Sequence, residues 1–488
     1  MFKYLSSLIE KPADFPAAQR IWDLRCKRAV LDGTIYDKLA YEFHDEENGN
    51  GEYIKLKQRA PSVRYNICRV VVEDATALLF SEGMFPGVAH GDADVKLSLE
   101  KLIADSNLPE VMTDATIRGS VGSVAVYMRV LNGRVFWSVY DTDYLTPEYD
   151  SKEPDVLIRM SEKYKVTGAD LIAAGYTIPD DAKDTPYWVQ RVWDTDSEKW
   201  YTPWKVSEKD TVPTVDEKRS VTHDLGFCPW TWIKNLPGGT DIDGKCTFRP
   251  AVDTQIVIEY QLSQANRGLT YSSDPTMVIK NPSQSDAEMK KGADTAIVVS
   301  DTGDVKLLEI TGTAANTVVE FCKSLRQMAL ETIGGSRAEA DKVTAPQSGR
   351  AQELMYQPLI WLADKMRSSY GQNGLLDMLR MVVRASEKFP LRTRDEDIGK
   401  LPPGAISLVW PDWFPATAGD RMNLATTLST LRTAEIISRE SAVSIIAPMY
   451  DIPDVQAELS KIKTDMADAD ARTKSLEATV TATETVDS

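Results

Sequence analysis

The stretch ETIGGSRAEADKVTAPQSGRAQELMYQPLIWLADKMRSSYG, residues 331–371, decides how this chain folds. A helical pattern stops at a Gly-Gly pair, and a segment rich in Gly, Ser, Pro and Gln follows it. The helical pattern resumes at Ser348 and continues to about Lys388, roughly 60 Å of helix at about 1.5 Å per residue. Pro358 lies inside this pattern, where it removes a backbone donor and clashes with the preceding turn, so we expect a kink there. The sequence thus predicts a loose loop between two long helices.

The composition bounds the classes of protein to which the chain can belong. At 488 residues it exceeds what one core usually organises, so we expect two to four structural regions. No run of about 18 apolar residues is present, which argues against a membrane span. The N-terminal apolar patch is interrupted by Glu10, Lys11 and Pro12 before a signal sequence could form. We therefore expect a protein that is made and kept inside a cell.

The formal net charge of −17 argues against a broad basic surface that grips nucleic acid. It is compatible with a wall past which DNA slides, because a surface that mostly repels phosphates does not trap the polymer. Composition supports a second interpretation equally well, in which the charge only keeps the surface soluble.

Side chains that could carry catalysis or bind a metal are scattered. The five cysteines form no CxxC pair and the three histidines do not cluster, so neither a disulfide framework nor a zinc site is predicted. HDEENGNGE (44–52) is typical of a turn, and GSVGS (119–123) lacks the Lys-Ser/Thr of a phosphate-binding loop. GGTDIDG (238–244) could place Asp241 and Asp243 on a cation, but the terminal Glu of a calcium loop is missing. We expect no metal, no cofactor and no enzymatic activity.

The first 240 residues have the pattern of a mixed α+β region. Helices are predicted over 58–80 and 98–118 from apolar residues spaced three and four apart. Two strands follow, joined at Leu131-Asn132-Gly133-Arg134, where the Asn-Gly pair suits a tight hairpin. Further strands are expected around residues 187–204, which are rich in Trp and Tyr.

The second half alternates helices with a small β-rich insert. A helix from Phe248 to about Arg267 is apolar on more than one face, so it should be covered on several sides. The insert is predicted to contain strands and one short helix, and a second long helix follows it. A strand and three short helices come next, with Ser438 as an N-cap. The predicted ranges are 276–280, 296–300 and 304–310 for the insert strands, with a turn at Gly303, 284–291 for its helix, 314–333 for the second long helix and 405–410 for the later strand.

This order of elements, together with four local segments, resembles the portal proteins of tailed bacteriophages, more specifically the SPP1 type. The segments are RYNICRVVVEDATALLFSEGM (64–84), HDLGFCPWTWIKN (223–235), SGRAQELMYQPL (348–359) and RTAEIISRESAV (432–443). The resemblance covers about residues 50–465. It departs from the family at Glu435, where a glycine often stands, which puts the left-handed geometry of that turn in doubt.

The resemblance implies an α+β portal fold that assembles into a ring, typically a dodecamer and possibly a 13-mer in isolation. Its parts would be a wing, a two-helix stem, a small clip, a tunnel loop, a long kinked wing helix and a short crown. Carried onto this chain, the ranges are 1–245 for the N-terminal wing, 246–268 for stem helix 1, 269–313 for the clip, 314–333 for stem helix 2, 334–347 for the tunnel loop, 348–415 for the rest of the wing, 416–463 for the crown and 464–488 for a disordered acidic tail.

The same resemblance assigns candidate site residues. The tunnel loop would line the DNA channel, with Arg337 and Lys342 touching phosphates transiently; its residues are Gly334, Gly335, Ser336, Arg337, Lys342, Thr344 and Gln347. The stem would form the subunit interface through Val252, Ile256, Tyr260, Phe321, Leu325 and Met328. The clip would face the terminase and an adaptor through Lys280, Lys290, Lys291 and Asp301.

The implied function is a portal at a unique capsid vertex. Double-stranded DNA would pass through it without sequence-specific binding, packaged by the large terminase subunit and later ejected. The implied partners are other copies of the chain, the terminase, a head–tail adaptor, and the major capsid and scaffolding proteins, with no membrane. The protein would be assembled in the host bacterial cytoplasm and located in the virion. The alternative is another structural virion protein, such as a minor head protein or scaffold-associated connector, that has no DNA channel.

Overall fold

The computed structural model divides the chain into two units. The larger is Met1–Arg337 with Tyr356–Trp413, and the smaller is Ala338–Met355 with Phe414–Ser488. Within 271–315, the structure describes the backbone of some residues but no side chains. The described residues are 1–11, 17–208, 211–273, 276–282, 299–308, 313–335, 354, 356–413, 418–447, 452 and 455–468.

Helices form one part of the larger unit, and two of them begin or divide where the periodicity did not predict it. The helix expected over 58–80 begins only at Ile67, because the Asn66 side chain accepts from Arg69 N at 3.0 Å and caps it. The helix expected over 98–118 is two helices separated by Asn107, whose φ is 51°. The N-terminal helices are α1 (Phe2–Ser7), α2 (Ala18–Leu31), α3 (Ile67–Phe80), α4 (Ala93–Asp105) and α5 (Leu108–Gly119).

Two antiparallel sheets make up most of the β structure of the larger unit. One is three-stranded in the order β10-β2-β3, and its β2–β3 turn confirms the predicted hairpin, with positive φ at Asn132 (52°) and Gly133 (78°). The other runs β4-β5-β6-β7-β9, with β8 paired to β6. The bounds are β2 (Ser123–Leu131), β3 (Arg134–Asp141), β4 (Leu145–Tyr149), β5 (Leu157–Thr167), β6 (Pro186–Trp193), β7 (Ser197–Trp200), β8 (Trp204–Lys205), β9 (Val221–Thr222) and β10 (Trp230–Lys234).

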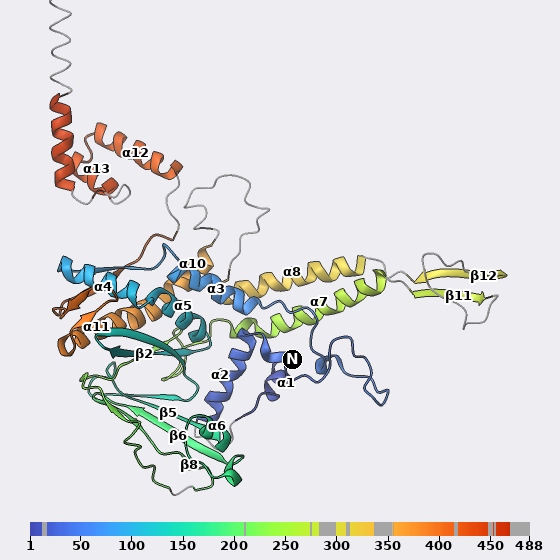
Figure 1. The fold of residues 1–488 in the computed structure, drawn as a ribbon. Helices are drawn as coiled ribbons and strands as arrows, with labels where there is room; N and C mark the ends of the chain where they lie inside the picture. The colour runs from blue at the N-terminus through green and yellow to red at the C-terminus, as the bar shows by residue number, and fades with distance from the viewer. Residues whose placement is uncertain are drawn as a thin grey trace, which may run out of the picture. The chain divides into compact units, whose positions relative to one another are not determined.

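The two long helices predicted on either side of the insert are present. After the short 3-10 turn η4 (Arg249–Ala251), α7 (Val252–Ser273) and α8 (Thr313–Ile333) lie side by side (Figure 1). Strands β11 (Thr276–Pro282) and β12 (Val299–Leu308) pair antiparallel between them in the chain. The described parts of the two predicted strands, 299–300 and 304–308, thus belong to a single strand. A register shift opposite Lys280–Pro282 accommodates Gly303, so the predicted turn is not formed there. The predicted helix 284–291 lies outside the described residues.

The long C-terminal helix departs from α geometry at a place other than the predicted one. The helix α10 (Gln357–Met366) has Pro358 in its first turn, where a missing N–H costs nothing, so the kink expected there is absent from the described part of the helix. A π-helical stretch, η7 (Arg367–Leu375), follows and leads into α11 (Leu376–Lys388). The predicted strand 405–410 is β15 (Ile406–Val409), paired with β1 (Gly87–His90); the short strands β13 (Leu391–Arg392) and β14 (Asp397–Gly399) pair with each other.

The smaller unit contains α12 (Ala418–Thr433), α13 (Arg439–Ile446) and a helix over 455–468. Ser438 caps α13 as predicted, with its side chain accepting from Ser441 N at 3.0 Å. Glu435 adopts φ 57°, so the doubt about this turn is resolved in favour of the left-handed geometry. Ile436 N donates to Leu431 O at 2.9 Å and Glu435 N to Arg432 O at 3.0 Å, the bonding of a Schellman motif. The 455–468 helix continues past 463, into the start of the predicted tail, and 469–488 lie outside the described residues.

Candidate functional site

The helix α7 contributes its predicted interface residues to the core of its own chain. Val252, Ile256 and Tyr260 are 0%, 1% and 4% exposed and belong to the main hydrophobic cluster of the larger unit. A side chain covered by its own subunit offers little surface to a neighbour, so burial does not favour the interface role expected for these three residues, and that role stays a prediction. The periodicity identified an apolar face correctly, but it carried no information about which chain covers that face.

A buried polar stripe on α7 fixes its register against the segment that leads into α3. Gln255 Oε1 accepts from Cys68 N at 3.0 Å, Glu259 Oε1 from Tyr65 N at 3.0 Å, and Ser263 Oγ from Val63 N at 3.0 Å. The three side chains are four residues apart, so they lie on one face of the helix. Each satisfies a backbone donor that the fold would otherwise bury unpaired.

Glu259 is the most constrained member of this stripe. Its second carboxylate oxygen accepts from the Tyr36 hydroxyl, and Gln255 Nε2 donates to the first at 3.3 Å. Burial raises the pKa of the Glu259 carboxyl above its ordinary range, against the opposing effect of these hydrogen bonds. Sequence reasoning did not single out this stripe, although a signal was present: polar residues at a spacing of four inside an otherwise apolar helix.

The helix α8 presents a different surface. Phe321 and Met328 are 51% and 52% exposed, and Leu325, between them, is half-buried against the core. Phe321 and Met328 are seven residues apart and therefore lie on one face. On α7, Val257 and Leu269 are also exposed. The parts of α7 and α8 whose side chains are described thus leave large apolar side chains uncovered, and contact with another subunit stays a prediction for Phe321, Leu325 and Met328.

The first two residues of the predicted tunnel loop lie against the first turn of α10 and against α3. Gly334 has φ 71° and ends α8, and Gly335 N donates to Leu330 O at 2.9 Å, which confirms the predicted helix stop. A methyl group added at Gly334 would lie 3.3 Å from the Pro358 carbonyl oxygen, and one at Gly335 only 2.5 Å from Val71 Cγ2. The chain therefore leaves α8 and re-enters at α10 at almost the same point.

The remaining predicted residues of the loop and the clip are not tested by these contacts. Lys280 lies on β11 and Asp301 on β12, for which only the backbone is described. The others lie outside the described residues: Ser336, Arg337, Lys342, Thr344 and Gln347 of the loop, and Lys290 and Lys291 of the clip.

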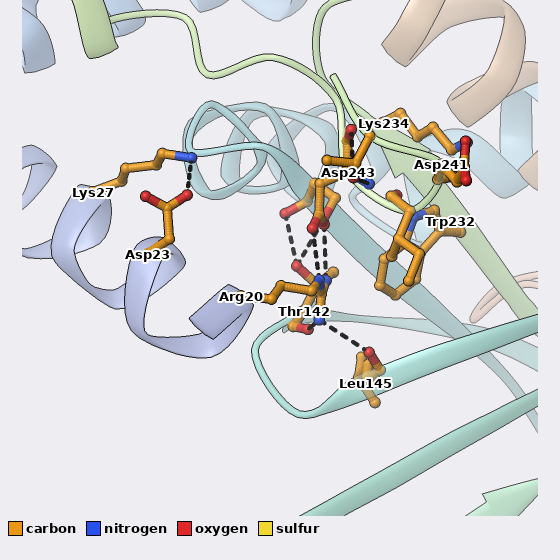
Figure 2. A network of polar contacts seen from close by, with 12 residues as sticks. Arg20, Asp23, Lys27, Thr142, Leu145, Trp232, Lys234, Asp241 and Asp243 are labelled. Atoms are coloured by element: carbon orange, nitrogen blue, oxygen red, sulfur yellow. Dashed lines mark hydrogen bonds and ion pairs between the residues drawn. The ribbon is translucent and has the colours of Figure 1, made fainter. Parts of the chain in front are cut away.

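The segment GGTDIDG takes part in an ion pair that docks α2 on the β structure (Figure 2). Arg20 Nε and Nη2 donate to the two Asp243 carboxylate oxygens at 2.6 and 2.8 Å, and Nη1 donates to Thr142 O at 2.8 Å. The Ser123 hydroxyl also donates to Asp243. The guanidinium thus occupies the position that a cation would take, so Asp243 is a structural residue.

The described residues include no cluster of three or more His, Cys, Asp or Glu side chains suited to a metal ion. All five cysteines are buried, and burial raises the pKa of the Cys26 and Cys246 thiols to about 11. In the described part of the chain, no helix has both the length and the apolar character needed to cross a bilayer.

A family model described as phage portal protein, SPP1 Gp6-like, matches residues 48–471. The chain belongs to this phage portal protein family. Among solved structures, a chain from the "Virion of native gene transfer agent (GTA) particle" matches over 79% of this chain and 89% of that chain, with 11% sequence identity and a TM-score of 0.39. A comparison with curated proteins gives no significant match.

Family membership confirms the resemblance stated from the four motifs, and the matched range closely follows the predicted one of about 50–465. It identifies a bacteriophage structural protein of the virion, with the portal or connector role of that family. The mixed helix and sheet architecture described above is consistent with the α+β portal fold that was expected.

Proposed function

We propose that this portal-family chain forms a ring at a unique capsid vertex and that double-stranded DNA passes along the ring axis. In this proposal the large terminase subunit packages the DNA from the clip side and a head–tail adaptor binds there afterwards. The ring itself acts as a conduit without intrinsic catalysis, so the energy for translocation comes from the motor.

The observation that carries the proposal is the close approach of Gly334 and Pro358, which flank the segment 336–355, in a chain whose family is that of portals. Gly334 lies against Pro358 in the first turn of α10, and Gly335 lies against Val71 of α3. In the proposed ring, the segment between these two points from every subunit would line the narrowest part of the channel.

The net charge of the chain supports a channel through which DNA slides rather than a surface that binds DNA tightly. A net charge of −17 leaves little favourable phosphate contact, so DNA would not be retained by counterion release. Within the proposed tunnel loop, Arg337 and Lys342 balance Glu339 and Asp341. A neutral collar can follow the duplex without gripping it.

The uncovered side chains of the stem supply surface for ring closure. A closed ring needs a heterologous contact, in which one patch meets a different patch on the next copy. The exposed Phe321 and Met328 on α8, with Val257 and Leu269 on α7, provide apolar side chains on two separate helices. We propose that α8 of one subunit packs on α7 of the next.

Negative-stain imaging of the purified chain tests the proposal. Rings of twelve or thirteen subunits with a central hole are expected, and a purely monomeric chain would overturn it. Phe321→Asp should lower the ring fraction at least severalfold, because it places a charge in the proposed apolar contact. The matched control Asn316→Asp adds the same charge at an exposed polar position of the same helix and should leave ring yield unchanged. Equal yields for both variants would contradict the role assigned to α8.

A further inference from the structure

The smaller unit contains a pocket that none of the roles described so far uses. It lies among α12, α13 and the 455–468 helix, the part drawn in orange and red in Figure 1, and has a volume of about 430 Å³. Val443, Ile446, Ile462 and Met466 contribute apolar walls, and Arg432 and Arg439 are also part of its lining. A volume of this size admits several side chains of a bound segment rather than a single atom group.

The two arginines give the pocket a positive edge. Among the described residues no carboxylate lies within ion-pair distance of either guanidinium, while Glu458, which also lines the pocket, has Lys461 Nζ at 3.4 Å. An occupant should therefore combine an apolar side chain with a carboxylate. Neither a bare phosphate backbone nor a purely apolar segment meets both requirements.

The same unit presents a turn with that combination. Ile436, between α12 and α13, is 68% exposed, and it does not contribute to the pocket lining. Glu435 precedes it at φ 57°, a left-handed conformation that is unfavourable for an ordinary residue and that glycine would adopt freely. The Schellman hydrogen bonds hold the turn in place, so Glu435 and Ile436 project as a preformed knob.

We infer that the Glu435–Ile436 turn of one copy inserts into the Arg432/Arg439 pocket of the next copy. Ile436 would enter the apolar part, and the Glu435 carboxylate would pair with the arginines at the edge. The knob and the pocket are different surfaces of one chain, which is the requirement for a heterologous contact that closes into a ring. This inference rests on the proposed ring and adds a second contact to it, in the crown, separate from the stem.

Cross-linking in the full-length chain tests the inference without depending on ring yield. In the double variant Ile436→Cys/Ala442→Cys, a short bis-maleimide should link the turn of each copy to the pocket of the next. The native cysteines are all buried, so the introduced thiols are the reactive ones. Because the contact is heterologous, we expect a ladder extending beyond dimers, with at least tenfold more multimer than either single variant gives.

The control Met422→Cys/Ala442→Cys places the first thiol at a side chain that is also 68% exposed but lies outside the proposed knob. It should give no ladder. Reversing the edge charge with Arg432→Glu and Arg439→Glu in the Ile436→Cys/Ala442→Cys background should lower the multimer yield severalfold. Negative-stain images of the same samples separate the two proposals: rings without a ladder overturn the crown contact alone, and absence of rings with no ladder overturns both.

Discussion

Glu259 shows how a single carboxylate can fix the position of a helix and set a pH dependence. It accepts from Tyr36, Tyr65 and Gln255, and the Arg64 guanidinium lies over the Tyr36 ring at 5.5 Å. Because burial raises its pKa, the folded state holds the Glu259 proton more tightly than the unfolded state does. Its contribution to stability is therefore complete below the ordinary glutamate range near pH ~4.3 and is lost as pH rises through the folded-state pKa.

The variant Glu259→Gln should remove this pH dependence. The amide keeps one acceptor for Tyr65 N and Gln255 Nε2, and the Tyr36 hydroxyl can turn to accept from the new NH₂ group. In urea unfolding followed from pH 4 to pH 8, the stability of the wild type relative to the variant should fall as pH rises. The exposed control Glu82→Gln should show no such trend. A relative stability that stays constant or rises with pH would contradict the assignment.

The π-helical stretch η7 shows an element shaped by what packs against it. Arg367 begins the stretch with its guanidinium 4.7 Å from the Trp410 ring and 3.3 Å from that of Trp413, and its Nη2 donates to Pro411 O at 3.1 Å. Burial lowers the pKa of Arg367 to about 10. Gly371 lets the Trp410 ring approach the helix backbone closely. These contacts hold residues 410–413 against η7.

Replacing Gly371 by alanine should disrupt this packing. The added Cβ would lie 2.5 Å from Trp410 Cζ2, so the ring has to move, and we expect a loss of about 1–3 kcal/mol in the free energy of unfolding. The control Gly268→Ala lies in α7 with nothing within 4 Å of the new Cβ, and it should stabilise the chain by about 0.5–1 kcal/mol through helix propensity. Chemical unfolding monitored by tryptophan fluorescence would compare the two; an equal response of both variants would rule out the role given to Gly371.

Elements with strong local signals were predictable, and elements set by distant contacts were not. The helices α7 and α8 follow from periodicity over some twenty residues, and the Asn132-Gly133 turn follows from backbone preference alone. The π geometry of η7 accompanies contacts with residues 410–413, which are far away in the sequence. The left-handed Glu435 is similar: side-chain propensity argues against it, and the hydrogen bonds of the turn override that preference.

For the proposed ring as a whole, the most direct prediction concerns the tunnel loop. Deleting residues 336–345 should leave rings intact, because both anchors of the segment lie outside the deletion, but DNA packaging or retention in particles should fall. A second variant, with the same ten residues replaced by a Gly/Ser segment of equal length, separates loop length from the side chains of Arg337 and Lys342. DNA content per particle is the measurement, and an unchanged content in the deletion variant would count against the channel role.

The candidate site was predictable in outline but not in its surfaces. The order of a helix, a small insert, a returning helix, a loop and a long helix led to the portal family, which the family match bears out. The sequence could not reveal that Val252, Ile256 and Tyr260 face inward, while Phe321 and Met328 remain exposed. That distinction depends on α3 and on the 63–68 segment, which cover one side of α7 and whose positions no local pattern encodes.

The contact between Gly334 and Pro358 has a consequence for how portals of this kind can diversify. Because Gly334 and Pro358 already lie close together, we expect that the number of residues between them can change without a loss of stability in the larger unit. If the proposed channel role holds, insertions and deletions in this segment would change the width of the channel from one phage to another. The same segment is then a position at which a reporter peptide could be inserted without altering the anchoring residues.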